Sequence, residues 1–425
     1  MMQEDLLQFI WQYNLYRPGN LKTTDGKTLQ VVQPGSLNRD SGPDFSMARI
    51  RIDHMTLIGN IELHVRSSDW LRHHHDHDPA YRKVILHVVY QHDLHLLPGD
   101  VPILELKEHI PFEVLYRYTN LIQTTAVLPC ASRLQVVPHI VRSSWLSRML
   151  VERWEGRLNQ WEQELQAASG DWQSLLYWRM AASFGFKVNT NPFLLLARSL
   201  PIRIILQQNQ LFQTEALLFG QAGFLGGSFM DEYPIALQKE YQYLRKKYGL
   251  EPIDLSLWKF LRMRPANFPT IRLAQFACLL RKSPTLFSSI SNHEPVQRIN
   301  RYLSVEASAY WNHHYRFDEL QKRSFVKKMG PETSNAIIIN TIAPIRFLYA
   351  HSHHDNPGYE AALALLEALP SEVNRITRMW DENGWQAGNA SQSQALIELY
   401  NNYCCRKRCL DCAVGLHIIK SGPDK

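Results

Sequence analysis

Two short stretches, Gly42-Pro43-Asp44 and Gly59-Asn60-Ile61-Glu62-Leu63-His64, decide the fold of the N-terminal part of this chain. Around the second stretch, apolar and polar side chains alternate from residue 56 to 66, which predicts a strand with one buried face. Glu62 and His64 are two positions apart, so both point to the same face. Asp44 opens the preceding strand-like segment, and the turn Asp53-His54-Met55 predicts a hairpin whose far end brings Asp44 near Glu62 and His64.

Two neighbouring carboxylates repel each other, and a hard divalent cation between them would offset this repulsion. We therefore predict that Asp44 and Glu62 hold Mg²⁺ or Mn²⁺, with His64 beside the attacking water. The alternative without chemistry is that Asp44 caps a turn while Glu62 and His64 line a solvated sheet face.

Other elements expected in the first third are a helix over residues 4–16, a strand over 29–33, a short helix near 79–83 and strands over 84–90 and 101–107. Their order, with Asp44 and the Glu62-x-His64 pattern, resembles the PD-(D/E)xK nuclease superfamily, in which an Asp opening one strand and a Glu-x-Lys on the next coordinate magnesium. The resemblance implies a restriction-endonuclease-like mixed sheet and a metal-dependent nuclease or phosphodiesterase acting on DNA or RNA. It also implies a further catalytic acid from the first helix, and Glu4 occupies the matching place.

The chain departs from that pattern because His64 stands where the superfamily has its catalytic lysine. A lysine there would polarise the attacking water and stabilise charge developing on phosphate. Histidine can act instead as a ligand or general base, and Lys83 or Lys107 can supply a cation from a neighbouring element. The missing lysine also favours a rival hypothesis, a non-catalytic scaffold that binds nucleic acid or protein with a degenerate nuclease fold.

The chain as a whole resembles an uncharacterised bacterial family of unknown function, which implies no activity. The motifs that carry this resemblance are Ser41-Gly42-Pro43-Asp44-Phe45, residues 59–64, Ser67-Ser68-Asp69-Trp70, residues 84–88, residues 215–224, residues 264–269 and Cys409-Leu410-Asp411-Cys412.

Histidine is concentrated in one region: ten of the eighteen histidines fall between residues 54 and 109, including His73-His74-His75-Asp76-His77-Asp78. If this segment folds over the Asp44/Glu62/His64 face, His73, His75 or Asp78 adds metal ligands or a proton shuttle. A zinc-dependent hydrolase built on this cluster is our third hypothesis; otherwise the segment is a polar loop. His87 interrupts an apolar strand and is either a hydrogen-bonded core residue or a further ligand.

Four cysteines near the C-terminus, Cys404, Cys405, Cys409 and Cys412, are followed by His417. These five residues are candidates for a structural zinc site. The alternative is a set of reduced cysteines packed among helices.

Composition sets the remaining expectations. With 425 residues and 45% hydrophobic content, the chain can bury more than one core, and the elements predict an α+β protein. We place a nuclease-like α/β domain at residues 1–135 and a larger all-α domain, with the Cys-rich C-terminal segment, at 136–425. The formal charge of +6 permits nucleic-acid binding. No long apolar run or secretory signal is present, so we expect a cytoplasmic protein without a membrane partner.

Overall fold

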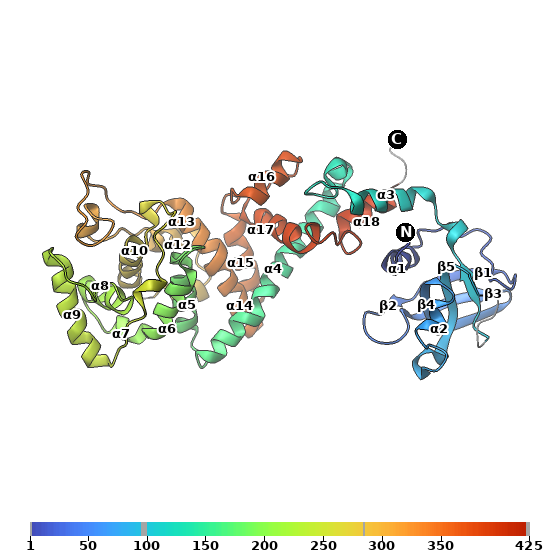
Figure 1. Ribbon diagram of the computed structural model, residues 1–425, viewed down its shortest axis with the longest axis horizontal. Helices are drawn as coiled ribbons and strands as arrows, with labels where there is room; N and C mark the ends of the chain where they lie inside the picture. The colour runs from blue at the N-terminus through green and yellow to red at the C-terminus, as the bar shows by residue number, and fades with distance from the viewer. Residues whose placement is uncertain (1, 95–99, 284, 422–425) are drawn as a thin grey trace. The chain divides into compact units, whose positions relative to one another are not determined.

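The computed structural model describes residues 2–94, 100–283 and 285–421 (Figure 1). The chain forms two compact units. The first comprises Met1–Leu146, Glu382–Trp385 and Leu399–Lys425, and the second comprises Ser147–Asp381 and Gln386–Glu398. This division differs from the predicted one, because the Cys-rich C-terminal segment belongs to the first unit rather than to the helical one.

A six-stranded mixed sheet forms the centre of the N-terminal part. The strands are β1 (Leu29–Gln33), β2 (Ser36–Leu37), β3 (Phe45–Ile52), β4 (Met55–Arg66), β5 (Val84–Gln91) and β6 (Ile103–Glu105). Their order is β1-β3-β4-β5-β6, with β2 also paired to β3. The pairs β1/β3, β2/β3 and β3/β4 are antiparallel, whereas β4/β5 and β5/β6 are parallel. The predicted hairpin is therefore present, and β5 lies beside the strand that carries Glu62 and His64.

The hairpin has an irregularity next to Asp44. The pairing of β3 with β4 shifts register between Phe45 and Ala48, and Met47 adopts a left-handed conformation with φ 56°. A bulge of this kind bends a strand and redirects the side chains beside it. Helix α1 (Glu4–Gln12) packs against β4 through a buried apolar stripe that includes Leu7 and Ile10. The helix thereby brings Glu4 and Gln8 to the end of the hairpin that carries Asp44.

Hydrogen bonds hold the first residues of the connection from β4 to β5 in place. It contains the one-turn helix α2 (Asp69–Arg72) and the 3-10 helix η1 (Pro79–Lys83). Asp93, which follows β5, accepts hydrogen bonds from the Ser67 hydroxyl and from both the backbone N–H and the hydroxyl of Ser68. Asp69 accepts a further bond from the backbone N–H of Arg66. These bonds fix the point at which the histidine-rich segment leaves the sheet.

The remainder of the first unit is helical. It contains η2 (Lys107–His109), α3 (Phe112–Gln123), η3 (Ala131–Val136), the π-helical turn η8 (Tyr400–Cys404) and α18 (Ala413–Lys420). Helix α18 packs on α3, and the Arg117 guanidinium donates to the backbone carbonyl of Ile419. Segments about three hundred residues apart in sequence are thus joined in one unit.

The second unit is helical in the residues described, and its core contains Phe184, Phe193, Phe219, Phe276 and Trp311. The long helix α4 (His139–Ala167) begins in the first unit and continues into the second. The further helices are α5 (Trp172–Phe184), α6 (Thr190–Ser199), α7 (Ile202–Leu206), α8 (Leu211–Gln221), α9 (Glu232–Tyr248), η4 (Leu255–Leu257), η5 (Pro265–Asn267), α10 (Pro269–Lys282), α11 (Leu286–Ser291), α12 (Val296–Leu303), η6 (Ala309–Asn312), α13 (Pro331–Ile337), η7 (Ile338–Ile342), α14 (Ala343–His353), α15 (Asn356–Glu367), α16 (Arg375–Glu382) and α17 (Ala390–Leu399).

The predicted fold class is confirmed: the protein is α+β, with a mixed sheet in the N-terminal part followed by a mostly helical region. In the part of the chain that the structure describes, no helix has both the length and the apolar character needed to cross a membrane.

Candidate metal centre on the sheet

The structure brings Asp44 and Glu62 together at the end of the hairpin. The backbone N–H of Asp44 donates to Glu62 Oε2 at 3.0 Å, and the backbone N–H of Leu63 donates to Asp44 Oδ2 at 2.9 Å. The Gln8 side-chain amide donates to Asp44 Oδ1 at 2.8 Å. Each oxygen of Asp44 therefore accepts a hydrogen bond, while Glu62 has one such bond on Oε2 and directs Oε1 toward histidines.

Both carboxyl groups are held in a setting that disfavours their charged forms. Burial, reinforced by the charge of Glu4, raises the pKa of Asp44 to about 7, against the hydrogen bonds that it accepts. Burial first and the charge of Asp44 second raise the pKa of Glu62 to about 9. Burial also raises the pKa of Glu4, whereas the neighbouring His73 lowers it. Glu4 thus lies close enough to act on the site through its charge.

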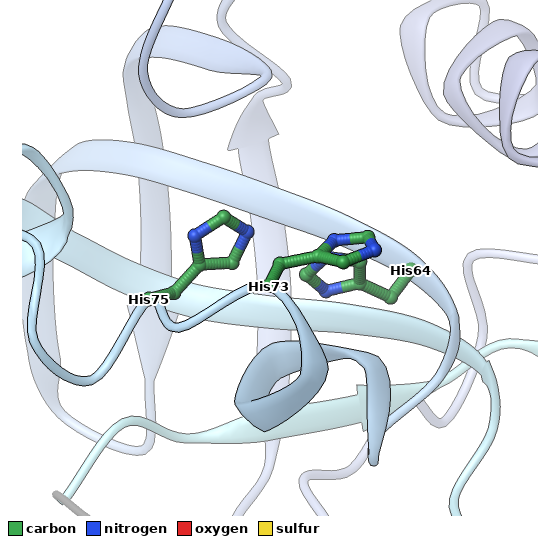
Figure 2. A group of neighbouring side chains, drawn as sticks. All are labelled: His64, His73 and His75. Atoms are coloured by element: carbon green, nitrogen blue, oxygen red, sulfur yellow. The ribbon is translucent and has the colours of Figure 1, made fainter.

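Three imidazoles, those of His64, His73 and His75, gather over the sheet (Figure 2). One nitrogen from each of His64, His73 and His75 lies within 4.8 Å of the other two, and among the described residues this is the one group of three potential ligands so arranged. His75 Nε2 is 3.3 Å and His64 Nε2 is 3.6 Å from Glu62 Oε1. His64 Nε2 is also 3.1 Å from His73 Nδ1. Two of the three imidazoles, those of His64 and His75, thus approach Glu62 Oε1, and the His73 ring joins the group through His64.

Local backbone geometry explains why two histidines of one loop face the same point. His73 ends α2, and His74 adopts the left-handed conformation, with φ 58°. A residue in this conformation ends a helix and reverses the chain direction. His73 and His74 are both exposed, and His75 is half-buried. The rings of His73 and His75 both approach His64, with centroids 5.0 and 5.3 Å from its ring. The segment therefore folds over the Asp44/Glu62/His64 face.

Aromatic residues form the wall behind the histidines. The Tyr81 ring stacks on His75 with centroids 3.7 Å apart, and Trp70 meets His64, His75 and His87 at ring-contact distances. Such packing limits the rotation of the imidazoles and holds their nitrogens in place. Sequence reasoning did not assign Trp70, Tyr81 or Gln8 to the site, although Trp70 stood in a motif and Gln8 is one helical turn after Glu4.

His87 lies behind His64 rather than within the group of three. Its Nε2 is 2.9 Å from His64 Nδ1, and both residues are fully buried. Burial is the first cause that lowers the pKa of His64 to about 2 and that of His87 to about 3, so both rings are neutral. In the described structure, His87 Nδ1 is buried without a hydrogen-bond partner. His87 is thus a partner of His64 rather than a member of the ligand group.

Residues 4–375 match the model of a family described as "Protein of unknown function (DUF2851)". The chain belongs to this family. No curated protein and no solved structure matches it. The family model therefore agrees with the full-length resemblance inferred from the sequence motifs, and the resemblance to PD-(D/E)xK nucleases stays a prediction.

Other predicted residues of this family member lie outside the ligand group. The Asp78 carboxylate caps η1 by accepting the backbone N–H of Ala80. Lys83 and Lys107, considered as substitutes for the superfamily lysine, are exposed on η1 and η2.

The raised pKa values predict how stability varies with pH when no metal is bound. The unfolded values are 3.8 for Asp44 and 4.5 for Glu62, below their folded values. A carboxyl group with a raised folded pKa contributes stability that is fully present below the unfolded pKa and lost as pH rises through the folded pKa. The lowered pKa values of His64 and His87 act in the opposite direction below about pH 6.5, because the unfolded state binds more protons at these two rings. We therefore expect the metal-free protein to lose stability mainly between about pH 6.5 and pH 9. Urea unfolding at a series of pH values checks this, and Glu62→Gln should flatten the upper part of the curve.

The structure separates the candidate ligands of the C-terminal zinc site into buried and exposed residues. Cys404, Cys409 and Cys412 are buried and line one pocket, whereas Cys405 is exposed and His417 lies on α18 outside the lining residues. A fourth buried cysteine, Cys130, lines the same pocket and was not part of the predicted set. Burial raises the pKa of Cys130 and of Cys409 to about 12, so these thiols are protonated in the metal-free protein.

Proposed function

We propose that this protein is a metal-dependent hydrolase of phosphodiester bonds, with nucleic acid as the substrate class, and that its metal is held by Glu62, His64, His73 and His75. The observation that carries the proposal is a group of three neighbouring imidazole nitrogens, beside which His64 and His75 both approach one oxygen of the buried Glu62 carboxyl group. Asp44 supports the site by donating its backbone N–H to the other oxygen of Glu62.

The donor set fits a divalent cation for an electrostatic reason. Without a cation, Glu62 is protonated because of burial and the nearby Asp44 charge. A cation at Oε1 would favour the carboxylate form and use the neutral imidazoles as nitrogen donors. Imidazole suits Zn²⁺ and related transition metals, whereas Mg²⁺ prefers oxygen ligands and keeps several waters. We therefore favour Mn²⁺ or Zn²⁺ over the Mg²⁺ that the nuclease resemblance alone implies.

A metal bound there would activate water and offset negative charge on a phosphodiester. The protein's own residues orient the donors. Neutral His64 can offer Nε2 only if its proton is on Nδ1, which then donates to His87 Nε2. Tyr81 and Trp70 restrict the rotation of His75 by ring contacts. Asp44, hydrogen-bonded to Gln8 and Leu63, holds the Glu62 side chain rather than offering a free oxygen.

Two alternatives have specific support. The imidazole-rich donor set favours a zinc-dependent hydrolase whose substrate is not a nucleic acid. The histidine at position 64, in place of the superfamily lysine, favours a scaffold that binds without cleaving. The phosphodiester proposal is preferred because the order of helix α1, the hairpin and the parallel strand β5 agrees with the nuclease-like arrangement predicted from the sequence.

One experiment separates the three. The full-length protein is stripped with a chelator, reloaded separately with Mn²⁺, Zn²⁺ or Mg²⁺, and assayed on single- and double-stranded DNA, on RNA and on a chromogenic phosphodiester. We expect cleavage that requires added Mn²⁺ or Zn²⁺ and that weakens steeply with salt on polymeric substrates. Metal binding without any cleavage, combined with a gel shift, would select the scaffold. Metal binding with neither cleavage nor a gel shift would select the zinc-dependent hydrolase whose substrate is not a nucleic acid.

A further inference from the structure

Four buried cysteines from two distant parts of the first unit line one apolar pocket. Cys130 precedes η3, Cys404 ends η8, Cys409 follows it, and Cys412 is the N-cap of α18. The charge on any one of Cys130, Cys409 and Cys412 would raise the pKa of the Cys404 thiol, so the four groups are near neighbours. All four are free cysteines, and each is less than 9% exposed.

The spacing of the four sulfurs distinguishes between a single ion and a larger group. Zinc with four thiolates at about 2.3 Å holds its sulfurs roughly 3.8 Å apart in a tetrahedron. In the described residues, no three cysteine sulfurs lie within 4.8 Å of one another, because the histidine group on the sheet alone meets that limit. A cluster of several metal ions holds its four thiolates farther apart, since the whole cluster lies between them.

We propose that Cys130, Cys404, Cys409 and Cys412 are the four ligands of an iron–sulfur cluster. This assignment replaces Cys405 and His417, which the sequence placed in a structural zinc site, by Cys130. Cys405 is exposed, and its thiol donates to the backbone carbonyl of Asn401, away from the pocket.

The surroundings of Cys412 suit an anionic ligand. Burial raises the pKa of the Cys412 thiol, and the nearby backbone N–H groups of Val414 and Gly415 act against this increase. Hydrogen bonds to the sulfurs are among the factors that set the properties of protein iron–sulfur clusters. Gly415 is required for this approach because a Cβ at this position would lie 2.0 Å from the Cys409 carbonyl oxygen.

A positively charged side chain near the pocket is also consistent with a negatively charged cluster. A cluster with four thiolate ligands is negatively charged, and the Arg408 side chain lines the pocket while pairing with Asp411.

The proposed role of the cluster is structural. Cys130 and the other three cysteines are separated by more than 270 residues, and the C-terminal segment returns to the first unit. A cluster bound to both segments would join them by metal–sulfur bonds in addition to the packing of α18 on α3. This inference does not depend on the proposed hydrolase activity.

The test measures iron and acid-labile sulfide in the full-length protein, purified without oxygen and then treated with iron salts and sulfide. We expect about four iron and four sulfide ions per chain, with the broad visible absorption of a thiolate-bound cluster. Cys130→Ser and Cys409→Ser should each remove most of the iron. Cys405→Ser is the matched control, because this thiol neighbours Cys404 in sequence but is exposed.

Each remaining outcome overturns the assignment. Wild-type protein that binds one zinc and no iron would replace the cluster by a zinc site, and wild-type protein that binds neither would exclude both. Equal loss of iron in Cys405→Ser and Cys130→Ser would contradict the ligand set. Because iron is measured first on the wild type, a variant that fails to fold does not decide the result.

Discussion

Glu62→Gln is expected to weaken the binding of Mn²⁺ or Zn²⁺ by more than about 100-fold and to abolish metal-dependent cleavage. Glu62 is the only carboxylate with an oxygen directed at the imidazoles among the described residues, and Gln removes its charge with little change in shape. Loss of an outer hydrogen-bond partner of a metal ligand typically lowers affinity by roughly 10- to 100-fold, and a direct charged ligand should contribute more. Calorimetric titration of the chelated protein measures the change.

The matched control for this substitution is Glu113→Gln, which removes one carboxylate from the exposed face of α3. It should bind metal like the wild type. If Glu62→Gln bound metal with unchanged affinity, the sheet would not be the metal site. If it lost binding but cleaved as before, the cleavage would belong to a contaminant or to another part of the chain.

The second large effect is expected at His87, whose side chain contacts the proposed ligand His64 and whose backbone pairs with Glu62 across β4 and β5. His87→Phe keeps an aromatic ring in the buried position but removes the acceptor for the His64 Nδ1 proton. We expect metal affinity to fall by roughly 10- to 100-fold, because the tautomer and orientation of His64 are no longer fixed. The measurement is a metal titration followed by the dependence of the cleavage rate on metal concentration.

A second variant distinguishes the positioning role of His87 from a merely structural one. His87→Gln, whose side-chain oxygen can accept the same bond, should recover part of the affinity lost in His87→Phe. The rate at saturating metal should remain close to that of the wild type in either variant. His54→Ala, in the exposed turn of the hairpin, is the control. If the Phe and Gln variants lost metal affinity equally and were also less thermally stable, His87 would be a packing residue only.

Strand patterns made most of the sheet predictable. The alternation of apolar and polar residues around Glu62 is a local signal, and the strands expected at 29–33 and 84–90 appear as β1 and β5. The turn Asp53-His54-Met55 fixed the hairpin and hence the approach of Asp44 to Glu62. These features depend on neighbours in sequence, which is why residue patterns contain them.

Features that depend on distant contacts could not be derived in the same way. The His73 to Asp78 segment has no periodicity, and its fold over the sheet depends on the left-handed conformation of His74 and on Asp93 pinning Ser68. Two positions in that segment, His73 and His75, were listed as candidates, but nothing in the spacing separated them from Asp78, which caps a turn instead.

The cysteine pocket also depends on contacts that are distant in sequence. Cys404, Cys405, Cys409 and Cys412 attract attention because they are close in sequence, and this closeness gave the exposed Cys405 the same weight as the buried three. Cys130 had no neighbour in sequence to mark it. It joins the pocket only because the C-terminal segment returns to the first unit, which the predicted boundary at residue 135 did not anticipate.

The most direct test of the metal centre is a crystal structure of the full-length protein soaked in Mn²⁺ or Zn²⁺, with anomalous scattering used to locate the ion. We predict one ion bonded to Glu62 Oε1 and to one nitrogen each of His64, His73 and His75, at about 2.0–2.2 Å. The His64 Nδ1 to His87 Nε2 hydrogen bond should remain. An empty site at saturating metal, with the His64 to His73 hydrogen bond intact, would contradict the account.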